Sequence, residues 1–213
     1  MITVVDYGCG NIAAIVNMLG RLGQTAKIAR TPKELEDASS IILPGVGAFD
    51  EGMKQLRDRK MRDVLDAKVL EAKVPLLGIC LGAQLICRKS EEGSEPGLAW
   101  VQADVVKFDQ ANLSEWDRIP NMGWHNVDYQ SSEQLFAGYE DDPRFYFVHS
   151  YHIVCDSGAD VIATADYGRP FPAAVKNANV IGVQFHPEKS HRYGLQLFQN
   201  FLNYYSAGLD EKS

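Results

Sequence analysis

The sequence predicts a single α/β domain over residues 1–213, with a mixed, mostly parallel sheet and helices on both faces. Three observations lead to this fold class. Up to about Lys89, short apolar runs alternate with stretches of helical period, as in a parallel sheet with helical crossovers. From Leu98 to about Phe185, short β runs are separated by Gly, Pro and Asp, which indicates a partly antiparallel portion. The hydrophobic content of 46% is enough for one sizeable core.

The expected elements of the first portion follow in order along the chain. Strands are expected at Ile2–Val5, Thr25–Ala29, 40–43 and 75–79. Helices are expected at Asn11–Leu22, from Thr31 onward, from Phe49 to Leu70 with a break near Arg59, and after strand 75–79 to about Lys89. The start at Thr31 rests on a capping threonine, a proline in the first turn and Glu34 three residues later.

In the second portion, strands are expected at Ala103–Phe108, Phe145–Val148, Asp160–Ala165, Ala173–Lys176 and 180–185. A terminal helix follows, with a buried stripe made of Leu195, Phe198, Leu202 and Tyr205. Residues Leu209–Ser213 are expected to fray. The sequence shows no internal repeat and no linker.

Composition excludes several classes of function. The net charge is −7 and no basic run is present, so a nucleic-acid surface is not expected. No apolar stretch reaches the roughly 20 residues of a membrane helix, and the first residues lack the basic region of a signal peptide. The four cysteines show neither metal nor disulfide spacing. We therefore expect a cytoplasmic protein without a bound metal or cofactor.

The strongest functional motif is Gly78-Ile79-Cys80-Leu81-Gly82, which follows an apolar strand and precedes a helix. This is the nucleophile-elbow pattern with sulfur in place of a serine hydroxyl. Glycines flank the nucleophile because a sharp strand-to-helix turn leaves no room for a Cβ there. The amides at the start of the helix favour a thiolate, so Cys80 is the predicted nucleophile.

A second motif, His186-Pro187-Glu188, ends the apolar run that begins at Val180. Cysteine chemistry needs a base that accepts the thiol proton and later protonates the leaving group. It also needs a group that orients the imidazole. In an extended segment, His186 and Glu188 would project to the same side. Alone, the motif suits a surface histidine; together with Cys80 it predicts a Cys-His-Glu triad.

Pro44-Gly45-Val46-Gly47 follows the strand at 40–43. An acyl-transfer site needs two amides for the developing oxyanion, one directly after the nucleophile and one from another strand–helix loop. Leu81 supplies the first amide by position. The two glycines let the backbone at Val46 approach a ligand closely, so Val46 is the second candidate. Without Cys80, an ordinary tight loop would be the simpler interpretation.

Four ordered motifs resemble the triad-type (class I) glutamine amidotransferases, which have a flavodoxin-like fold. They are Leu-Pro-Gly-Val-Gly (43–47), Gly-Ile-Cys-Leu-Gly-x-Gln (78–84), Phe-Val-His-Ser-Tyr (147–151) and Gly-Val-Gln-Phe-His-Pro-Glu (182–188). The resemblance extends to about Tyr205. It implies that glutamine is the substrate, that Cys80, His186 and Glu188 are catalytic, and that no cofactor is required. The residues implied to hold glutamine are Gly45, Gly47, Gln84, His149, Ser150 and Tyr151.

Two further segments, 6–11 and 120–124, are similar to the branch of this family that serves imidazole glycerol phosphate synthases in the histidine pathway. This similarity implies a partner synthase of the (β/α)₈ type in a heterodimer, which would receive the ammonia. Asn11, Trp124 and Lys189 would then face the partner. A dedicated partner is also expected because free ammonia would be protonated and escape.

The sequence departs from the family pattern at three places. Ala83 stands where methionine is usual, His125 stands where asparagine is usual, and His191-Arg192-Tyr193 is bulkier than usual. None of these is a triad residue. The last two fall in regions expected near the partner, so they leave the identity of the partner open.

Alternative functions remain at this stage. A paralogous subunit could supply ammonia to a sugar-modifying synthase, for example in surface polysaccharide assembly. A stand-alone cysteine hydrolase would not need the glutamine-specific Gln84, and a silent regulatory subunit would not need an intact triad. Gly8-x-Gly10-x-x-Ala13 also matches a dinucleotide fingerprint. That fingerprint requires an acid after the second strand, where the sequence has Arg30 instead.

Overall fold

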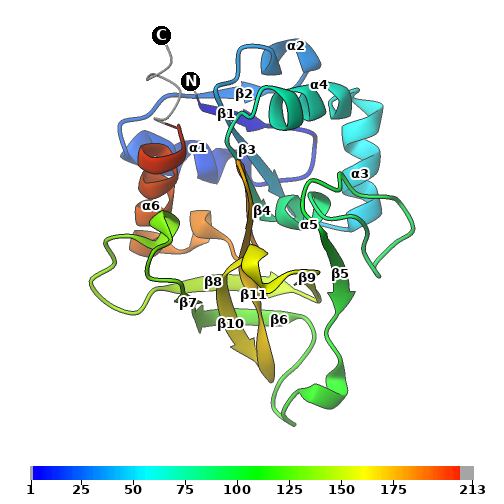
Figure 1. Cartoon of the computed structure of the whole chain (residues 1–213), viewed down its shortest axis with the longest axis vertical. Coiled ribbons are helices and arrows are strands. Elements are labelled where there is room, and N and C mark those ends of the chain that lie inside the picture. Colours follow the sequence, from blue (N-terminus) through cyan, green and yellow to red (C-terminus); the bar gives the residue numbers. More distant parts are fainter. Residues whose placement is uncertain (1, 207–213) are drawn as a thin grey trace.

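A computed structural model describes residues 2–206, and side chains up to Asn203. Its main sheet has eight strands in the order β2-β1-β3-β4-β12-β11-β10-β7. The five strands from β2 to β12 are parallel to one another, and the pairs β12–β11, β11–β10 and β10–β7 are antiparallel. In sheet order, the strands are Ala26–Ala29, Ile2–Val5, Ser40–Gly45, Leu76–Cys80, Val180–Val183, Arg169–Asn177, Val161–Tyr167 and Asp128–Tyr129. The predicted mixed, mostly parallel sheet is confirmed (Figure 1).

Two small antiparallel pairs extend the lower part of the molecule in Figure 1. They are β5 (Ala103–Lys107) with β9 (Tyr151–Cys155), and β6 (Asn121–Asn126) with β8 (Arg144–His149). The predicted antiparallel character of this portion is confirmed, but β6 and β9 were not predicted. Strand β6 escaped because Met122 and Trp124 are exposed, so it lacks the apolar alternation of a half-buried strand.

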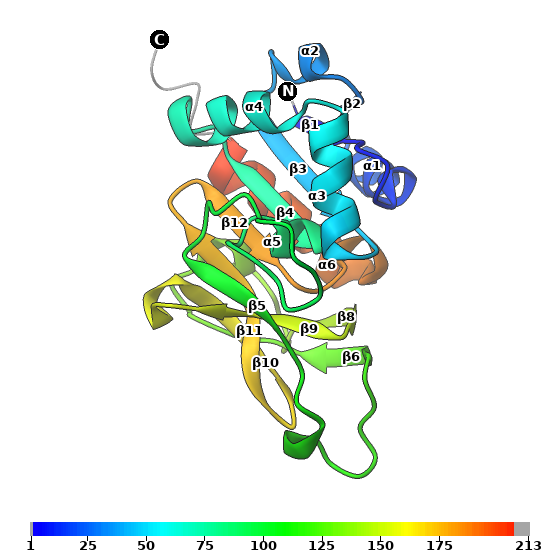
Figure 2. The ribbon, with the colours of Figure 1, turned by 90° about the vertical axis from the view of Figure 1, so that its right-hand side faces the viewer.

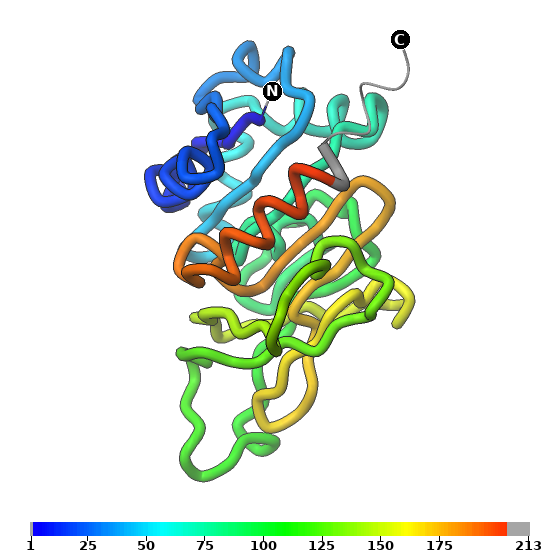
Figure 3. Tube along the Cα trace, turned by 90° about the vertical axis from the view of Figure 1, so that its left-hand side faces the viewer, coloured from blue at the N-terminus to red at the C-terminus, as the bar shows by residue number. Residues whose placement is uncertain are grey.

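Helices cover both faces of the parallel strands. Helices α1 (Ile12–Arg21) and α6 (His191–Asn200) lie on one face, as Figure 3 shows. Helices α3 (Phe49–Asp58), α4 (Arg62–Asp66) and α5 (Leu81–Leu85) lie on the other face (Figure 2). The remaining helical segments are α2 (Pro32–Leu35), two π-helical turns at Ala67–Glu71 and Phe201–Ser206, and 3₁₀ turns at Gln110–Asn112, Gln134–Phe136, Gly158–Asp160 and Pro187–Lys189.

Alternation along each strand gives each face its own hydrophobic core. In β3, Ile42 packs into the cluster beneath α1 and α6, whereas Ile41 and Leu43 pack into the cluster beneath α3 and α5. The two clusters contain large, fully buried side chains such as Phe198 on the first face and Phe49 on the second. The sheet is therefore fixed from both sides, and so is the strand that ends at Cys80.

Most predicted helices are confirmed, including the break near Arg59, where α3 ends, and the start of α2 after Thr31. Glu34 completes the expected capping contact, since its Oε2 accepts the Thr31 N–H at 2.9 Å. Of the predicted terminal stripe, Phe198 and Leu202 are buried and Leu195 is partly buried. The side chain of Tyr205 and the predicted fraying of 209–213 lie outside the described residues.

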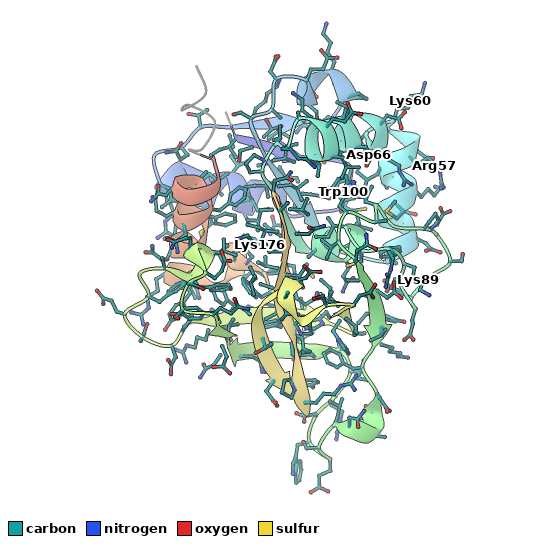
Figure 4. All side chains as sticks on the ribbon, in the orientation of Figure 1. Arg57, Lys60, Asp66, Lys89, Trp100 and Lys176 are labelled. Atoms are coloured by element: carbon teal, nitrogen blue, oxygen red, sulfur yellow. The ribbon has the colours of Figure 1, made fainter. Side chains whose placement is uncertain are left out.

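The prediction that the helix after Cys80 runs to about Lys89 is wrong, because α5 ends at Leu85. The carbonyls at the end of this helix bind a returning loop instead of amides one turn further on. The Leu85 carbonyl accepts the Leu98 N–H at 2.8 Å, and the Arg88 carbonyl accepts the Gly97 N–H at 2.7 Å. The same loop is tied to α4, since Trp100 Nε1 donates to Asp66 Oδ1 at 2.7 Å (Figure 4).

Candidate active site

Cys80 occupies the turn between β4 and α5 with a φ of +52°. This left-handed conformation is strained for a residue with a side chain, and only the surrounding packing can hold it. The neighbouring glycines allow the close approach: a Cβ on Gly82 would lie 1.9 Å from the Leu43 carbonyl oxygen, and one on Gly78 would lie 2.9 Å from the Gly82 oxygen. The backbone therefore presents Cys80 as an elbow, with the side chain mostly buried.

His186 reaches the same place from the strand next to β4. Strand β12 pairs in parallel with β4, with Val183 opposite Ile79, and His186 follows three residues after β12 ends. Its Nδ1 lies 2.7 Å from Glu188 Oε1, in a pair whose side chains are 1% and 2% exposed. The expected extended segment is wrong, because Pro187–Lys189 forms a 3₁₀ turn. That turn nevertheless brings the carboxylate to the imidazole.

The environment of His186 favours its protonated form. Burial opposes protonation most strongly, but the charge and hydrogen bonding of Cys80 and of Glu188 together outweigh it and raise the pKa of His186 well above its usual value. With Nδ1 engaged by Glu188, Nε2 has no hydrogen-bond partner among the described residues. It is available to exchange a proton at the thiol.

These residues open into a cavity of about 540 Å³. It is lined by Asn11, Val46, Gly47, Cys80, Leu81, Gln84, Glu92, Pro120, Val148, His149, Ser150, Tyr151, His186 and Lys189. The cavity thus brings together most of the predicted site residues. Gly45 is buried behind Val46, Glu188 lies behind His186, and Trp124 lies apart, in a separate surface hollow with Arg144 and His191.

The two predicted oxyanion donors lie on adjacent strand ends. Gly45, the last residue of β3, is opposite Cys80, the last residue of β4, so Val46 and Leu81 follow side by side. Leu81 begins α5, where the first amides of a helix have no intrahelical partner. The Val46 side chain is 42% exposed, so this loop sits at the mouth of the cavity. Asn11, also at the mouth, caps α1 by accepting the Ala14 N–H at 3.3 Å.

Two buried amides join the thiol to the wall that carries residues 149–151. Gln84 Nε2 donates to the Tyr151 carbonyl at 3.1 Å and to Gln184 Oε1 at 3.2 Å. Gln184 Nε2 in turn lies 3.9 Å from Cys80 Sγ. Sequence reasoning did not single out Gln184, although an amide inside the apolar run 180–185 was a usable signal.

A second polar chain holds the same wall from the other side. His125 Nε2 lies 2.7 Å from Asn121 Oδ1, Asn121 Nδ2 lies 3.2 Å from His149 Nε2, and His149 Nδ1 lies 2.7 Å from the Tyr151 carbonyl. Burial lowers the pKa of His149 to about 3, so its ring is neutral. A neutral ring protonated on Nδ1 satisfies every contact in the chain. The unusual His125 is therefore connected to the cavity, a link that depends on strand pairing and was not predicted.

Glu92 is another cavity residue without a sequence signal. It lies in the loop after α5, and its Oε2 accepts the Phe49 N–H at the start of α3 at 2.8 Å. Asp50 fixes the same loop by accepting the amides of Ser94 and Glu95. Among the described residues, no group of three or more His, Cys, Asp or Glu side chains is arranged to hold a metal ion.

The fold, with a cysteine elbow facing a His–Glu pair, is that of a class I glutamine amidotransferase. Residues 3–204 match the family model described as glutamine amidotransferase class-I, and the chain belongs to this family. It is similar to the imidazole glycerol phosphate synthase subunit HisH 2 of Pseudomonas aeruginosa, with 47% identity covering 95% of this chain and 98% of the relative. The HisH subunit of Bdellovibrio bacteriovorus is 48% identical, covering 94% of this chain and 98% of the relative.

Solved structures support the fold. A crystal structure described as a glutamine amidotransferase has a TM-score of 0.73 at 23% identity, covering 98% of this chain and 99% of that one. A protein of a putative GMP synthase from Thermoplasma acidophilum has a TM-score of 0.72 at 25% identity, covering 99% of this chain and 95% of that one. Within residues 2–206, no helix has the length and apolar character needed to span a membrane.

Proposed function

We propose that this chain, acting as a single glutaminase domain, hydrolyses glutamine and passes the ammonia to a partner synthase of histidine biosynthesis. The observation that carries this proposal is the Cys80 elbow beside the buried His186–Glu188 pair, at the end of a cavity lined by Gln84 and Tyr151. The HisH names of the relatives support the pathway. The free cysteines suit a reducing compartment such as the cytoplasm.

In the proposed mechanism, the Cys80 thiolate attacks the side-chain carboxamide carbon of glutamine. The amides of Val46 and Leu81 stabilise the oxyanion of the tetrahedral intermediate. His186, oriented by Glu188, protonates the nitrogen as the C–N bond breaks, which releases ammonia and leaves a γ-glutamyl thioester on Cys80. Water that is deprotonated by His186 then attacks the thioester, and glutamate leaves as the thiol re-forms.

The proposed partner is a (β/α)₈ cyclase that uses the ammonia to form imidazole glycerol phosphate and aminoimidazole carboxamide ribonucleotide. Exposed apolar side chains near the cavity support a docking face, namely Val46 (42% exposed), Met122 (62%) and Trp124 (41%). The exposed Asn11 and Lys189 at the cavity mouth would meet the partner first. We expect weak glutaminase activity until the partner and its nucleotide ligand are bound.

The test is glutamate release from glutamine, with and without the cyclase of the source organism and a nucleotide ligand. Strong stimulation by that cyclase is expected. The Cys80→Ala variant should lose glutamine hydrolysis, by a factor on the order of 10⁶, while the complex still uses ammonium salts. Cys87→Ala is the matched control, because Cys87 is a buried thiol outside the cavity. Glutamine use by the Cys80→Ala variant would contradict the assigned nucleophile.

A second candidate is a paralogous subunit that serves a sugar-modifying synthase. Two relatives, from Pseudomonas aeruginosa and Methanococcus maripaludis, are numbered HisH 2, which indicates more than one such subunit in those organisms. The bulky His191, which stacks on Trp124 at 5.5 Å, also alters the face proposed for the partner. Rescue of a histidine auxotroph by this chain would favour the first candidate; glutaminase activity without rescue or cyclase stimulation would favour the second.

A further inference from the structure

The hydroxyl of Tyr7 has no hydrogen-bond partner among the described residues, although the side chain is fully buried. Tyr7 follows β1 and packs with the core cluster beneath α3 and α5. A buried hydroxyl that makes no hydrogen bond destabilises the state in which it is found. Phenylalanine would fill the same space without that cost, so packing alone does not account for a tyrosine.

The unpartnered hydroxyl lies against the strand end that carries the proposed oxyanion loop. A Cβ on Gly45 would lie 2.6 Å from the Tyr7 oxygen, 2.7 Å from the Gly82 nitrogen and 2.7 Å from Leu81 Cβ. The Tyr7 oxygen and the first turn of α5 therefore border the same small space beside Gly45. Tyr7 does not line the cavity, so its hydroxyl approaches the loop from the buried side.

The peptide between Gly45 and Val46 is well placed to turn. On its far side, Gly47 has a φ of +109° and a Cβ there would meet nothing within 4 Å. The Val46 side chain is 42% exposed, so no packed core side chain has to move with it. On its near side Gly45 has no side chain to obstruct rotation.

We propose that Tyr7 is a positioning residue, whose hydroxyl donates a hydrogen bond to the Gly45 carbonyl oxygen when the Gly45–Val46 peptide turns its N–H towards Cys80. This inference rests on the proposed glutaminase reaction. The N–H and C=O of a trans peptide point in opposite directions, so aiming the Val46 N–H at the cavity turns the Gly45 carbonyl towards the interior. A buried carbonyl needs a donor, and Tyr7 supplies one.

The hydroxyl keeps its proton for this role. Burial first, and then the charges of Cys9 and Cys80, raise the pKa of Tyr7 well above its usual value. The hydrogen bond forms in the state that completes the oxyanion site, so it favours that state over the resting one. Tyr7 would thereby act on the rate of the chemical step without touching glutamine.

The test compares Tyr7→Phe with Thr3→Val in the complex with the partner cyclase and its ligand. Thr3 is the matched control, since its buried Oγ1 also lacks a partner among the described residues. It lies on β1 opposite Ile41, which pairs with Leu76 at the end of β4 remote from Cys80. Tyr7→Phe should lower the stimulated kcat about tenfold and leave the KM for glutamine, ammonium-dependent synthesis and the Tm undiminished.

Thr3→Val should leave kcat unchanged and should not lower the Tm. An unchanged kcat in Tyr7→Phe would overturn the inference. A lower Tm in Tyr7→Phe would also overturn it, because the hydroxyl would then have a partner in the resting fold. No glutamate release by the unaltered complex would instead overturn the proposed function, and the inference with it.

Discussion

The parallel and antiparallel regions of the molecule hold their parts of the site by different means. In the parallel region, Cys80 is fixed by backbone packing, since the first turn of α5 approaches Leu43 too closely for any residue but glycine at 82. In the antiparallel region, the wall at Tyr151 is held by side-chain hydrogen bonds from Gln84 and, through a chain of three residues, from His125. Changes in the first region should therefore abolish activity, whereas changes in the second should adjust it.

The largest effect is expected at the elbow itself. In Gly82→Ala the new Cβ would lie 1.9 Å from the Leu43 carbonyl oxygen, so β3 and α5 would have to separate and Cys80 would move. Glutamate release should fall below detection, and the Tm should drop. Gly20→Ala is the control: nothing lies within 4 Å of that Cβ, and alanine in α1 should stabilise the fold by about 1 kcal/mol. Full activity in Gly82→Ala would contradict the packing argument.

The next effect is expected at the seam between the regions, in Glu188→Gln. The amide orients His186 less well and carries no charge, so kcat/KM should fall about 100-fold, far less than in Cys80→Ala. Glu71→Gln, which changes an exposed carboxylate away from the cavity, should have no effect. A loss as complete as that of Cys80→Ala would mean that Glu188 does more than orient the imidazole.

The same variant should change the pH dependence. Glu188 is one of the groups that raise the pKa of His186 against the opposing effect of burial, so the pH profile of kcat/KM should move to lower pH in Glu188→Gln. A raised folded-state pKa also stabilises the fold below the unfolded value of about 6.5, and this stabilisation is lost as the pH rises through the folded value. Thermal unfolding across that range should show a weaker dependence in the variant.

A smaller effect is expected in the antiparallel region. His125→Ala removes the first member of the chain that reaches the Tyr151 carbonyl, which leaves Asn121 and His149 less well ordered. A hydrogen bond of about 1 kcal/mol corresponds to roughly a fivefold rise in the KM for glutamine, with kcat little changed. Asn126→Ala, an exposed position on the same strand, is the control. A fall in kcat at constant KM would place His125 in the chemistry instead.

The smallest effect is expected where a surface ion pair joins the two regions. Arg88, just after α5, lies 2.8 Å from Asp104 on β5 and 2.5 Å from Asp156 after β9. These groups are partly exposed, so Arg88→Ala should lower the free energy of unfolding by at most about 1 kcal/mol, and less at high salt. Urea unfolding at two salt concentrations measures this. A larger loss would show that the regions depend on that contact.

The two regions also differ in how far the sequence predicts them. Helices and strands of the parallel region follow from apolar periodicity, and only the end of α5 was wrong, because the loop at Gly97 and Leu98 captures its carbonyls. Strand β6 gave no usable pattern, since its apolar side chains Met122 and Trp124 face solvent. Local periodicity reports burial against one core, and these segments depend on distant partners.

The candidate site divides in the same way. Cys80, His186 and Glu188 stand in short local motifs whose chemistry can be recognised from neighbouring residues. The contacts of Gln184 with Gln84 and of His125 with Asn121 depend on how strands pair across long stretches of chain. Strand pairing was predicted only as a class, so these contacts could not be derived from the sequence.

The adjacency of β4 and β12 has a consequence for evolution. Thiol and imidazole are delivered by neighbouring parallel strands, with Val183 opposite Ile79, at a spacing of about 4.8 Å that the backbone sets. The chain between these strands can thus accumulate substitutions and still return the histidine to the sulfur. Ancestral drift in that insertion could diversify the recipients of ammonia while the reaction stayed the same, and the shared fold at 23% identity fits such a history.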